Sequence, residues 1–141
     1  MLAYLKELLT QNPFVEAIDL SSKGIVAVDA QSLSILARFT ELRRLDLSDN
    51  YIKRLPQDLS ALMRISDFDL NGNPIEDVNG AVDAIRDGIP GLRALKINLH
   101  EEEQVDYLLR QLQGLEELNG LAVEREALFS SNEYGEEEEV P

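Results

Sequence analysis

One spacing of apolar residues recurs along the chain and constrains its fold more than any other feature. In the stretch LRRLDLSDNYIKRLP, residues 42–56, leucine or isoleucine occupies positions 1, 4, 6, 11 and 14, and asparagine occupies position 9. Neither the 3.6-residue period of a helix nor the alternation of a strand produces this spacing. The same frame fits from residues 15, 42, 65, 92 and 115, at intervals of 27, 23, 27 and 23 residues. The chain is therefore predicted to contain about five copies of one structural unit.

This spacing has a direct physical interpretation. Positions 4 and 6 are two residues apart, so a short strand centred there points both apolar side chains to the same side. Asparagine at position 9 can donate to and accept from backbone groups where the chain turns off the strand. Asn50 and Asn73 form two rungs of such a structural asparagine ladder, and Lys23 and His100 take that place in the first and fourth copies.

A single copy buries too little apolar surface to offset the entropy of ordering its backbone, so the copies have to stack. We therefore predict an α/β solenoid with a parallel sheet on its concave side. The two 27-residue intervals carry apolar residues at helical spacing over 33–39 and 82–89, which predicts helices on the convex side. The 23-residue interval that starts at Leu42 has room only for a tight turn or a short helix.

The two ends of a solenoid need covering. Residues 1–14 carry an apolar helical stripe and are predicted to form an N-terminal helical cap. Residues 105–112 carry a second stripe, which predicts a helix in a C-terminal cap. The repeat domain with this cap is predicted to span 15–128. Residues 129–141 have little to bury and are predicted to be a disordered acidic tail or linker.

The charge of the chain limits its partners. The formal net charge is −14, and residues 129–141 hold five acids and no base, so the remainder carries −9. Such a surface repels phosphate backbones and anionic lipids, so no direct nucleic acid or membrane binding is expected. The chain has no cysteine, and its first residues lack the basic region and cleavage site of a signal peptide. We expect an intracellular protein, cytoplasmic or cytoskeletal, with the nucleus as an alternative.

The stretches LRRLDLSDNYIKRLP and DFDLNGNPIEDV resemble leucine-rich repeats, and the resemblance covers about residues 15–121. The segment LLRQLQGLEELNG resembles the capping motif of short intracellular leucine-rich repeat proteins. That group includes the acidic leucine-rich nuclear phosphoproteins, the leucine-rich regulatory subunit of protein phosphatase 1, axonemal dynein light chain 1 and the A′ protein of a spliceosomal particle. The resemblance implies a curved binding scaffold without catalysis, which recruits a protein partner through its concave sheet.

Positions 3 and 5 of each copy point away from the core and predict the partner-binding face. Adjacent strands lie about 4.8 Å apart, so aspartates at position 5 of three successive copies would stand in a row that ends at a lysine. This row indicates an acidic groove for a basic peptide or helix. The predicted partner-binding residues are Asp19, Arg44, Asp46, Asp67, Asp69, Asn71 and Lys96. The alternative is that these aspartates are a regular, solvated feature of the repeat.

Other candidate sites are weaker. Tyr51 follows a ladder asparagine and is a candidate anchor at the rim of the groove, with packing against the next repeat as the alternative. The stretch DLNGN begins like a calcium loop, but Pro74 and Gly80 stand where that loop needs glycine and glutamate. His100 is the only histidine, and no catalytic residue, metal site or cofactor is predicted. Ser130, followed by an acid three residues later, is a candidate phosphorylation site.

These observations favour a non-catalytic scaffold for a protein partner with a basic or amphipathic segment. A cytoskeletal or ciliary adaptor, a targeting subunit and a phosphatase regulatory subunit are not separated by the residues. A second hypothesis is an acidic nuclear regulator or chaperone that binds basic proteins such as histones. We expect a monomer, and linker-like composition near residue 141 suggests the N-terminal domain of a longer protein.

Overall fold

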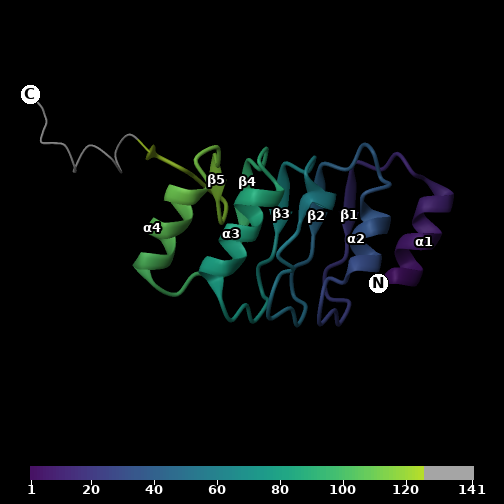
Figure 1. The fold of residues 1–141 in the computed structure, drawn as a ribbon, viewed down its shortest axis with the longest axis horizontal. Coiled ribbons are helices and arrows are strands. Elements are labelled where there is room, and N and C mark those ends of the chain that lie inside the picture. Colours follow the sequence, from purple (N-terminus) through teal and green to yellow (C-terminus); the bar gives the residue numbers. More distant parts are fainter. Residues whose placement is uncertain (126–141) are drawn as a thin grey trace, which may run out of the picture.

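Each repeat contributes one short strand to a single sheet (Figure 1). The computed structural model describes residues 1–125. The strands are β1 (Ala17–Asp19), β2 (Arg44–Asp46), β3 (Asp67–Asp69), β4 (Ala94–Lys96), β5 (Glu117–Leu118) and β6 (Leu121–Ala122). The first five follow one another in parallel, and each begins at position 3 of the frame. The stacked solenoid predicted from the spacing is confirmed.

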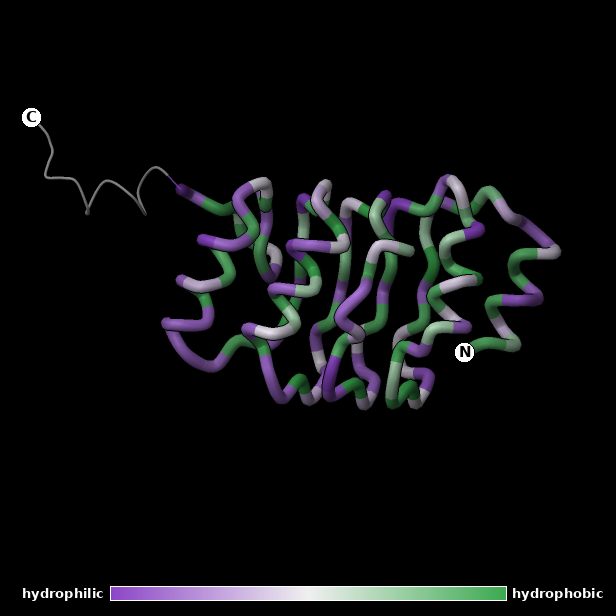
Figure 2. Tube along the Cα trace, in the orientation of Figure 1, coloured by the Kyte–Doolittle hydropathy of each residue, from purple (hydrophilic) through white to green (hydrophobic). Residues whose placement is uncertain are grey.

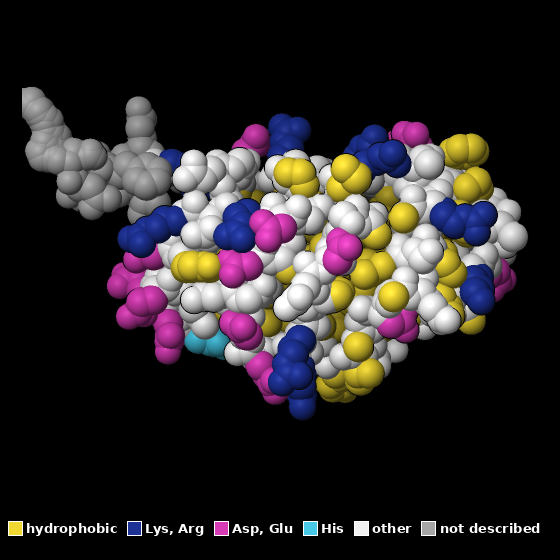
Figure 3. Space-filling view, viewed as in Figure 1, with side chains coloured by type: hydrophobic (Ala, Val, Ile, Leu, Met, Phe, Trp, Pro, Cys, Tyr) yellow, Lys and Arg dark blue, Asp and Glu magenta, His cyan; other side chains and the backbone are white. Residues whose placement is uncertain are grey.

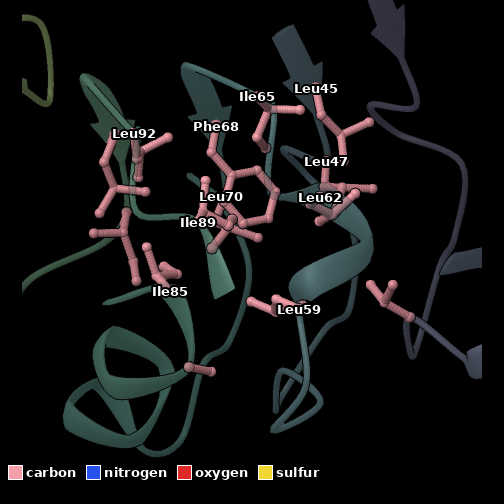
Figure 4. Packing of buried hydrophobic residues seen from close by; sticks show 14 of the residues in the cluster. Leu45, Leu47, Leu59, Leu62, Ile65, Phe68, Leu70, Ile85, Ile89 and Leu92 are labelled. Atoms are coloured by element: carbon pink, nitrogen blue, oxygen red, sulfur yellow. The ribbon is translucent and has the colours of Figure 1, made fainter. Parts of the chain in front are cut away.

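The core consists of rows of apolar side chains that run from repeat to repeat. The strand register places position 4 of one copy beside position 4 of the next. Position 4 is filled by Ile18, Leu45, Phe68 and Leu95, and position 6 by Leu20, Leu47, Leu70 and Ile97. None of these eight side chains is more than 2% exposed. Figure 4 shows the rows meeting apolar residues from the helical side, and Figure 2 shows apolar segments recurring in every coil.

The helices form a layer on the side of the sheet that the core rows face. They are α1 (Leu2–Gln11), α2 (Ala30–Leu36), the 3₁₀ turn η1 (Ser60–Leu62), α3 (Val78–Gly88) and α4 (Glu102–Gln111). The predictions of helices in both long intervals, of a tight turn or short helix in the 23-residue interval and of a helix at each end are therefore confirmed. None of these helices is long and apolar enough to span a membrane.

The helix layer is interrupted at its centre. Helix α1 packs on α2 and α3 packs on α4, while only η1 lies between α2 and α3. A Cβ atom at Gly88 would lie 2.7 Å from Leu59 Cβ, so α3 requires glycine where it meets the short repeat. Apolar side chains are visible between α2 and α3 on this face, and acidic ones gather near α4 (Figure 3).

Asparagine side chains join neighbouring turns. Asn50 Oδ1 accepts from the N–H groups of Lys23 (2.9 Å) and Ile25 (3.0 Å) in the preceding repeat. Its Nδ2 donates to three carbonyl oxygens, those of Leu20, Leu47 and Ser48. Asn73 Oδ1 accepts from Ile52 N–H, and its Nδ2 donates to the carbonyls of Leu47 and Leu70. Each ladder side chain therefore satisfies buried backbone groups in two repeats at once.

The C-terminal end differs from the simple repeat pattern. Asn119 and Gly120 have φ values of 51° and 84°, and they turn the chain so that β6 runs antiparallel to β5. Asn-Gly is the preferred pair for a two-residue hairpin of this kind. The guanidinium group of Arg125 then donates to the carbonyl oxygens of Leu109, Leu112 and Leu115. These bonds supply a donor to carbonyls at and beyond the C-terminal end of α4, where a helix leaves its last carbonyls without intrahelical partners.

Candidate interaction surface

The face of the sheet opposite the helices is hollowed into a groove of about 430 Å³. We call this hollow the concave groove. It is lined by positions 3 and 5 of β1 to β3, by Ala94 and Lys96 of β4 and by Glu117 of β5, with backbone and core side chains of the strands at its floor. Alternation along each strand places these side chains on the face that the core does not use.

The concave groove carries charges that form no ion pair with the rest of the described chain, residues 1–125. Five acidic side chains and two basic ones line it, which gives a formal charge of −3. The acids are Asp19, Asp46, Asp67, Asp69 and Glu117, and the bases are Arg44 and Lys96. The ion pairs among residues 1–125 involve none of these seven side chains. The groove therefore offers its charges to solvent or to a ligand.

The three position-5 aspartates stand in register on adjacent strands, followed by Lys96. Each one also has a local structural role. The Oδ1 atoms of Asp19, Asp46 and Asp69 accept backbone N–H groups two residues further on, at 2.9, 2.8 and 2.9 Å. These bonds hold the turn that follows each strand. No hydrogen bond within residues 1–125 uses the Oδ2 atoms of these three aspartates, so these oxygens remain free to accept from a ligand.

Two of these aspartates have pKa values shifted in opposite directions. Burial raises the pKa of Asp69 above its ordinary value, and repulsion from Asp46 and Asp49 adds to this, against the opposing effects of the Asn71 N–H and Lys96. Hydrogen bonds from the Ser21 hydroxyl and backbone N–H lower the pKa of Asp19. The folded protein therefore disfavours the charged form of Asp69 and favours the charged form of Asp19.

This difference predicts opposite effects of neutralisation. The raised pKa means that the Asp69 charge destabilises the fold at neutral pH, and this cost disappears as the pH falls through the raised pKa. Asp69→Asn keeps an Oδ1 acceptor for the turn and is expected to stabilise the protein at neutral pH, with no gain below the ordinary aspartate pKa. Urea unfolding of both proteins at the two pH values measures this.

Asp19→Asn is the matched control for that experiment. Its lowered pKa means that the charged carboxylate stabilises the fold at neutral pH, and that this contribution is lost as the pH falls through the lowered pKa. The substitution is therefore expected to destabilise the protein at neutral pH. The same sign for both substitutions would contradict the assigned causes.

The structure places two of the predicted residues, Asn71 and Tyr51, outside the lining of the concave groove. The side chain of Asn71 is exposed in the turn after β3 and does not line the groove. Tyr51 is 64% exposed, and its N–H donates to Ile25 O, next to Val26, which is 70% exposed. Ser130 lies outside the described residues.

At the end of the sheet, Asn119 departs from the frame and Glu117 follows it. The frame puts Asn119 at position 5, on the concave face, but β5 ends at Leu118 and Asn119 lies in the hairpin turn. Its Oδ1 accepts from Ile97 N–H at 2.8 Å instead. Glu117 was absent from the predicted binding residues but lines the groove. Its position 3 in the fifth copy was the signal for this placement.

No candidate metal site lies among the residues that the structure describes. Residues 1–125 contain no group of three or more His, Asp or Glu side chains placed to hold a metal ion. The acids near His100 begin α4 instead. There, Gln104 Oε1 accepts from the N–H groups of His100 (2.7 Å) and Glu101 (3.2 Å), which are among the unpaired donors at a helix start.

Comparisons with known proteins agree with this architecture. No family model matches the sequence. Human leucine-rich repeat protein 1 is 35% identical over 68 residues, which span 48% of this chain and only 16% of that protein. The crystal structure of the Drosophila melanogaster SNF/U2A' complex contains a similar chain, with a TM-score of 0.71 and 18% identity over 84% of this chain and 67% of its own. The Chaetomium Mex67:Mtr2 subunits overlap with a TM-score of 0.49 and 21% identity, over 77% of this chain and 80% of that one.

Proposed function

We propose that this chain, a short leucine-rich repeat protein, is a non-catalytic scaffold that binds a protein partner through its concave groove. The observation that carries the proposal is the set of seven charged side chains in the groove that take part in no ion pair within residues 1–125. Like charges on adjacent strands destabilise a sheet. A ligand of opposite charge would offset that cost, and the turns after the strands use only one oxygen of each position-5 aspartate.

The sign of the charge indicates the kind of partner. A groove with a formal charge of −3 in a chain of −14 attracts a segment rich in Lys and Arg and repels polyanions. The SNF/U2A' structure, which shares this fold, is a complex, and we propose that this chain uses the fold in the same general way. The partner's identity would then separate an intracellular adaptor, a phosphatase regulatory subunit and an acidic nuclear regulator of basic proteins.

Neutralising two groove aspartates tests the proposal. Asp46→Asn with Asp69→Asn removes two charges and keeps the Oδ1 acceptors that hold both turns. Proteins captured from cell extract by the unmodified chain are expected to fall at least about tenfold with this double variant, because it removes two electrostatic contacts. Quantitative mass spectrometry of the captured proteins measures the change and identifies the partner.

The control for this test changes the same charge elsewhere. Glu7→Gln with Asp106→Asn also removes two acids, from exposed positions of α1 and α4 that lie outside the groove. This variant is expected to capture the same proteins as the unmodified chain. If both double variants capture as much protein as the unmodified chain, the concave groove does not hold the partner. If both variants lose capture to the same extent, binding depends on net charge alone.

A further inference from the structure

The charged row of the concave groove has a defined spacing as well as a sign. Asp19, Asp46, Asp69 and Lys96 occupy the same register position on four adjacent parallel strands. Neighbouring strands in a sheet lie about 4.8 Å apart. Measured across the strands from Asp19, the other three residues therefore lie at about 5, 10 and 14 Å. The row presents three negative groups at a regular interval and then one positive group.

Only one common backbone conformation matches this interval. A helix rises about 1.5 Å per residue, so residues i, i+3, i+7 and i+10 lie at about 0, 4.5, 10.5 and 15 Å and share one face. In an extended segment, side chains on one face recur about every 6.7 Å, and the second already falls between Asp46 and Asp69. A helix lying across the strands therefore meets all four charged groups, and an extended peptide does not.

The position-3 row leaves room beside Asp19 and Lys96, the two ends of the charged row. Ala17 and Ala94 occupy position 3 of β1 and β4, next to Asp19 and Lys96 at the two ends of the row. Small side chains at both ends allow the backbone of a helix to approach the sheet. Arg44 and Asp67 stand between them in the same row, on β2 and β3.

Building on the proposed function, we propose that the partner segment is an α-helix that lies across the strands, with basic residues at i, i+3 and i+7 and an acidic residue at i+10. The basic residues face the three aspartates, and the acidic residue faces Lys96. Because Lys96 stands at one end of the row, the charge order selects one of the two directions in which a helix can lie. Charge complementarity thus sets both the register and the orientation of the partner helix.

Designed peptides test this assignment on the full chain. The matched probe is an alanine-based helical peptide held by side-chain lactam bridges, with Lys at i, i+3 and i+7 and Glu at i+10. The shifted probe has the same composition, with the four charges distributed around the helix. Fluorescence anisotropy at low salt is expected to show at least about tenfold tighter binding of the matched probe, because only it faces all four charges of the position-5 row together.

A charge exchange tests the orientation. Lys96→Glu is expected to weaken binding of the matched probe and to strengthen binding of a probe with Lys in place of Glu at i+10. Lys53→Glu makes the same charge change at an exposed residue that does not line the groove, and is expected to alter neither Kd. If the probe with Lys at i+10 gains affinity for the Lys96→Glu variant and not for the Lys53→Glu variant, the i+10 residue of the helix lies over β4.

Failure of this inference differs from failure of the proposed function. Equal affinity for the matched and shifted probes would overturn the helix register. So would the absence of tighter binding between the Lys96→Glu variant and the probe with Lys at i+10. The loss of partner capture by the Asp46 and Asp69 double variant does not depend on the conformation of the ligand. If that loss is seen and the probes do not discriminate, the groove binds a protein segment that is not a helix in this register.

Discussion

Replacing Asn50 with alanine is expected to lower the free energy of unfolding by about 3–4 kcal/mol. The side chain is 3% exposed and bonds five backbone groups in two repeats. Alanine leaves the N–H groups of Lys23 and Ile25 without this acceptor, and each buried unsatisfied group costs about 1–3 kcal/mol. Equilibrium unfolding in urea, followed by circular dichroism, measures the change.

Two other asparagines provide graded controls for this experiment. Asn73 bonds three backbone groups, so Asn73→Ala is expected to cost less than Asn50→Ala. Asn71 is exposed, and its side chain makes no hydrogen bond within residues 1–125, so Asn71→Ala is expected to change stability by less than about 0.5 kcal/mol. Equal losses at the three positions would contradict the ladder as the source of the effect.

Leu47→Ala is expected to lower the free energy of unfolding by about 2–5 kcal/mol. Leu47 is 1% exposed and stands in the position-6 row between Leu20 and Leu70, so truncation leaves a cavity within the stack rather than at its surface. Stacked repeats take much of their stability from contacts with their neighbours, and a cavity there weakens the contacts on both sides. The same urea experiment measures this loss.

A leucine at the edge of the sheet serves as the control for Leu47. Leu121 in β6 is 73% exposed, and Leu121→Ala is expected to change stability by less than about 0.5 kcal/mol. A loss at Leu47 below about 1 kcal/mol would be inconsistent with its placement in the core.

The sequence left two explanations for the position-5 aspartates, a ligand groove and a regular feature of the repeat. The structure shows a local role, since each Oδ1 atom holds the turn after its strand. That role uses one of the two oxygens, and binding through the other stays a prediction. Substitution by asparagine separates the two roles, because it keeps the acceptor and removes the charge.

At the C-terminal hairpin, the repeat frame no longer predicts where a side chain lies. When the frame is continued into the fifth copy, it predicts that Asn119 lies on the concave face. Asn-Gly at 119–120 is a strong local turn signal that competes with that register. The hairpin formed, so the strand ended after Leu118 and Asn119 turned to Ile97. The Asn-Gly turn signal outweighed the periodic pattern at this end of the stack. Within residues 1–125, no further parallel strand pairs with β5.

The sequence by itself determined the repeat frame, the place of a strand near position 4 of each copy, the core rows and the intervals that hold the helices. Each of these depends on the period of apolar residues, which every copy carries within its own two dozen residues. The tertiary structure decided which groove charges are unpaired within residues 1–125, which carboxylate oxygens accept hydrogen bonds there, and how Arg125 donates to carbonyls at the C-terminal end of α4. These features depend on distances between residues far apart in the chain, and those distances exist only once the repeats have stacked.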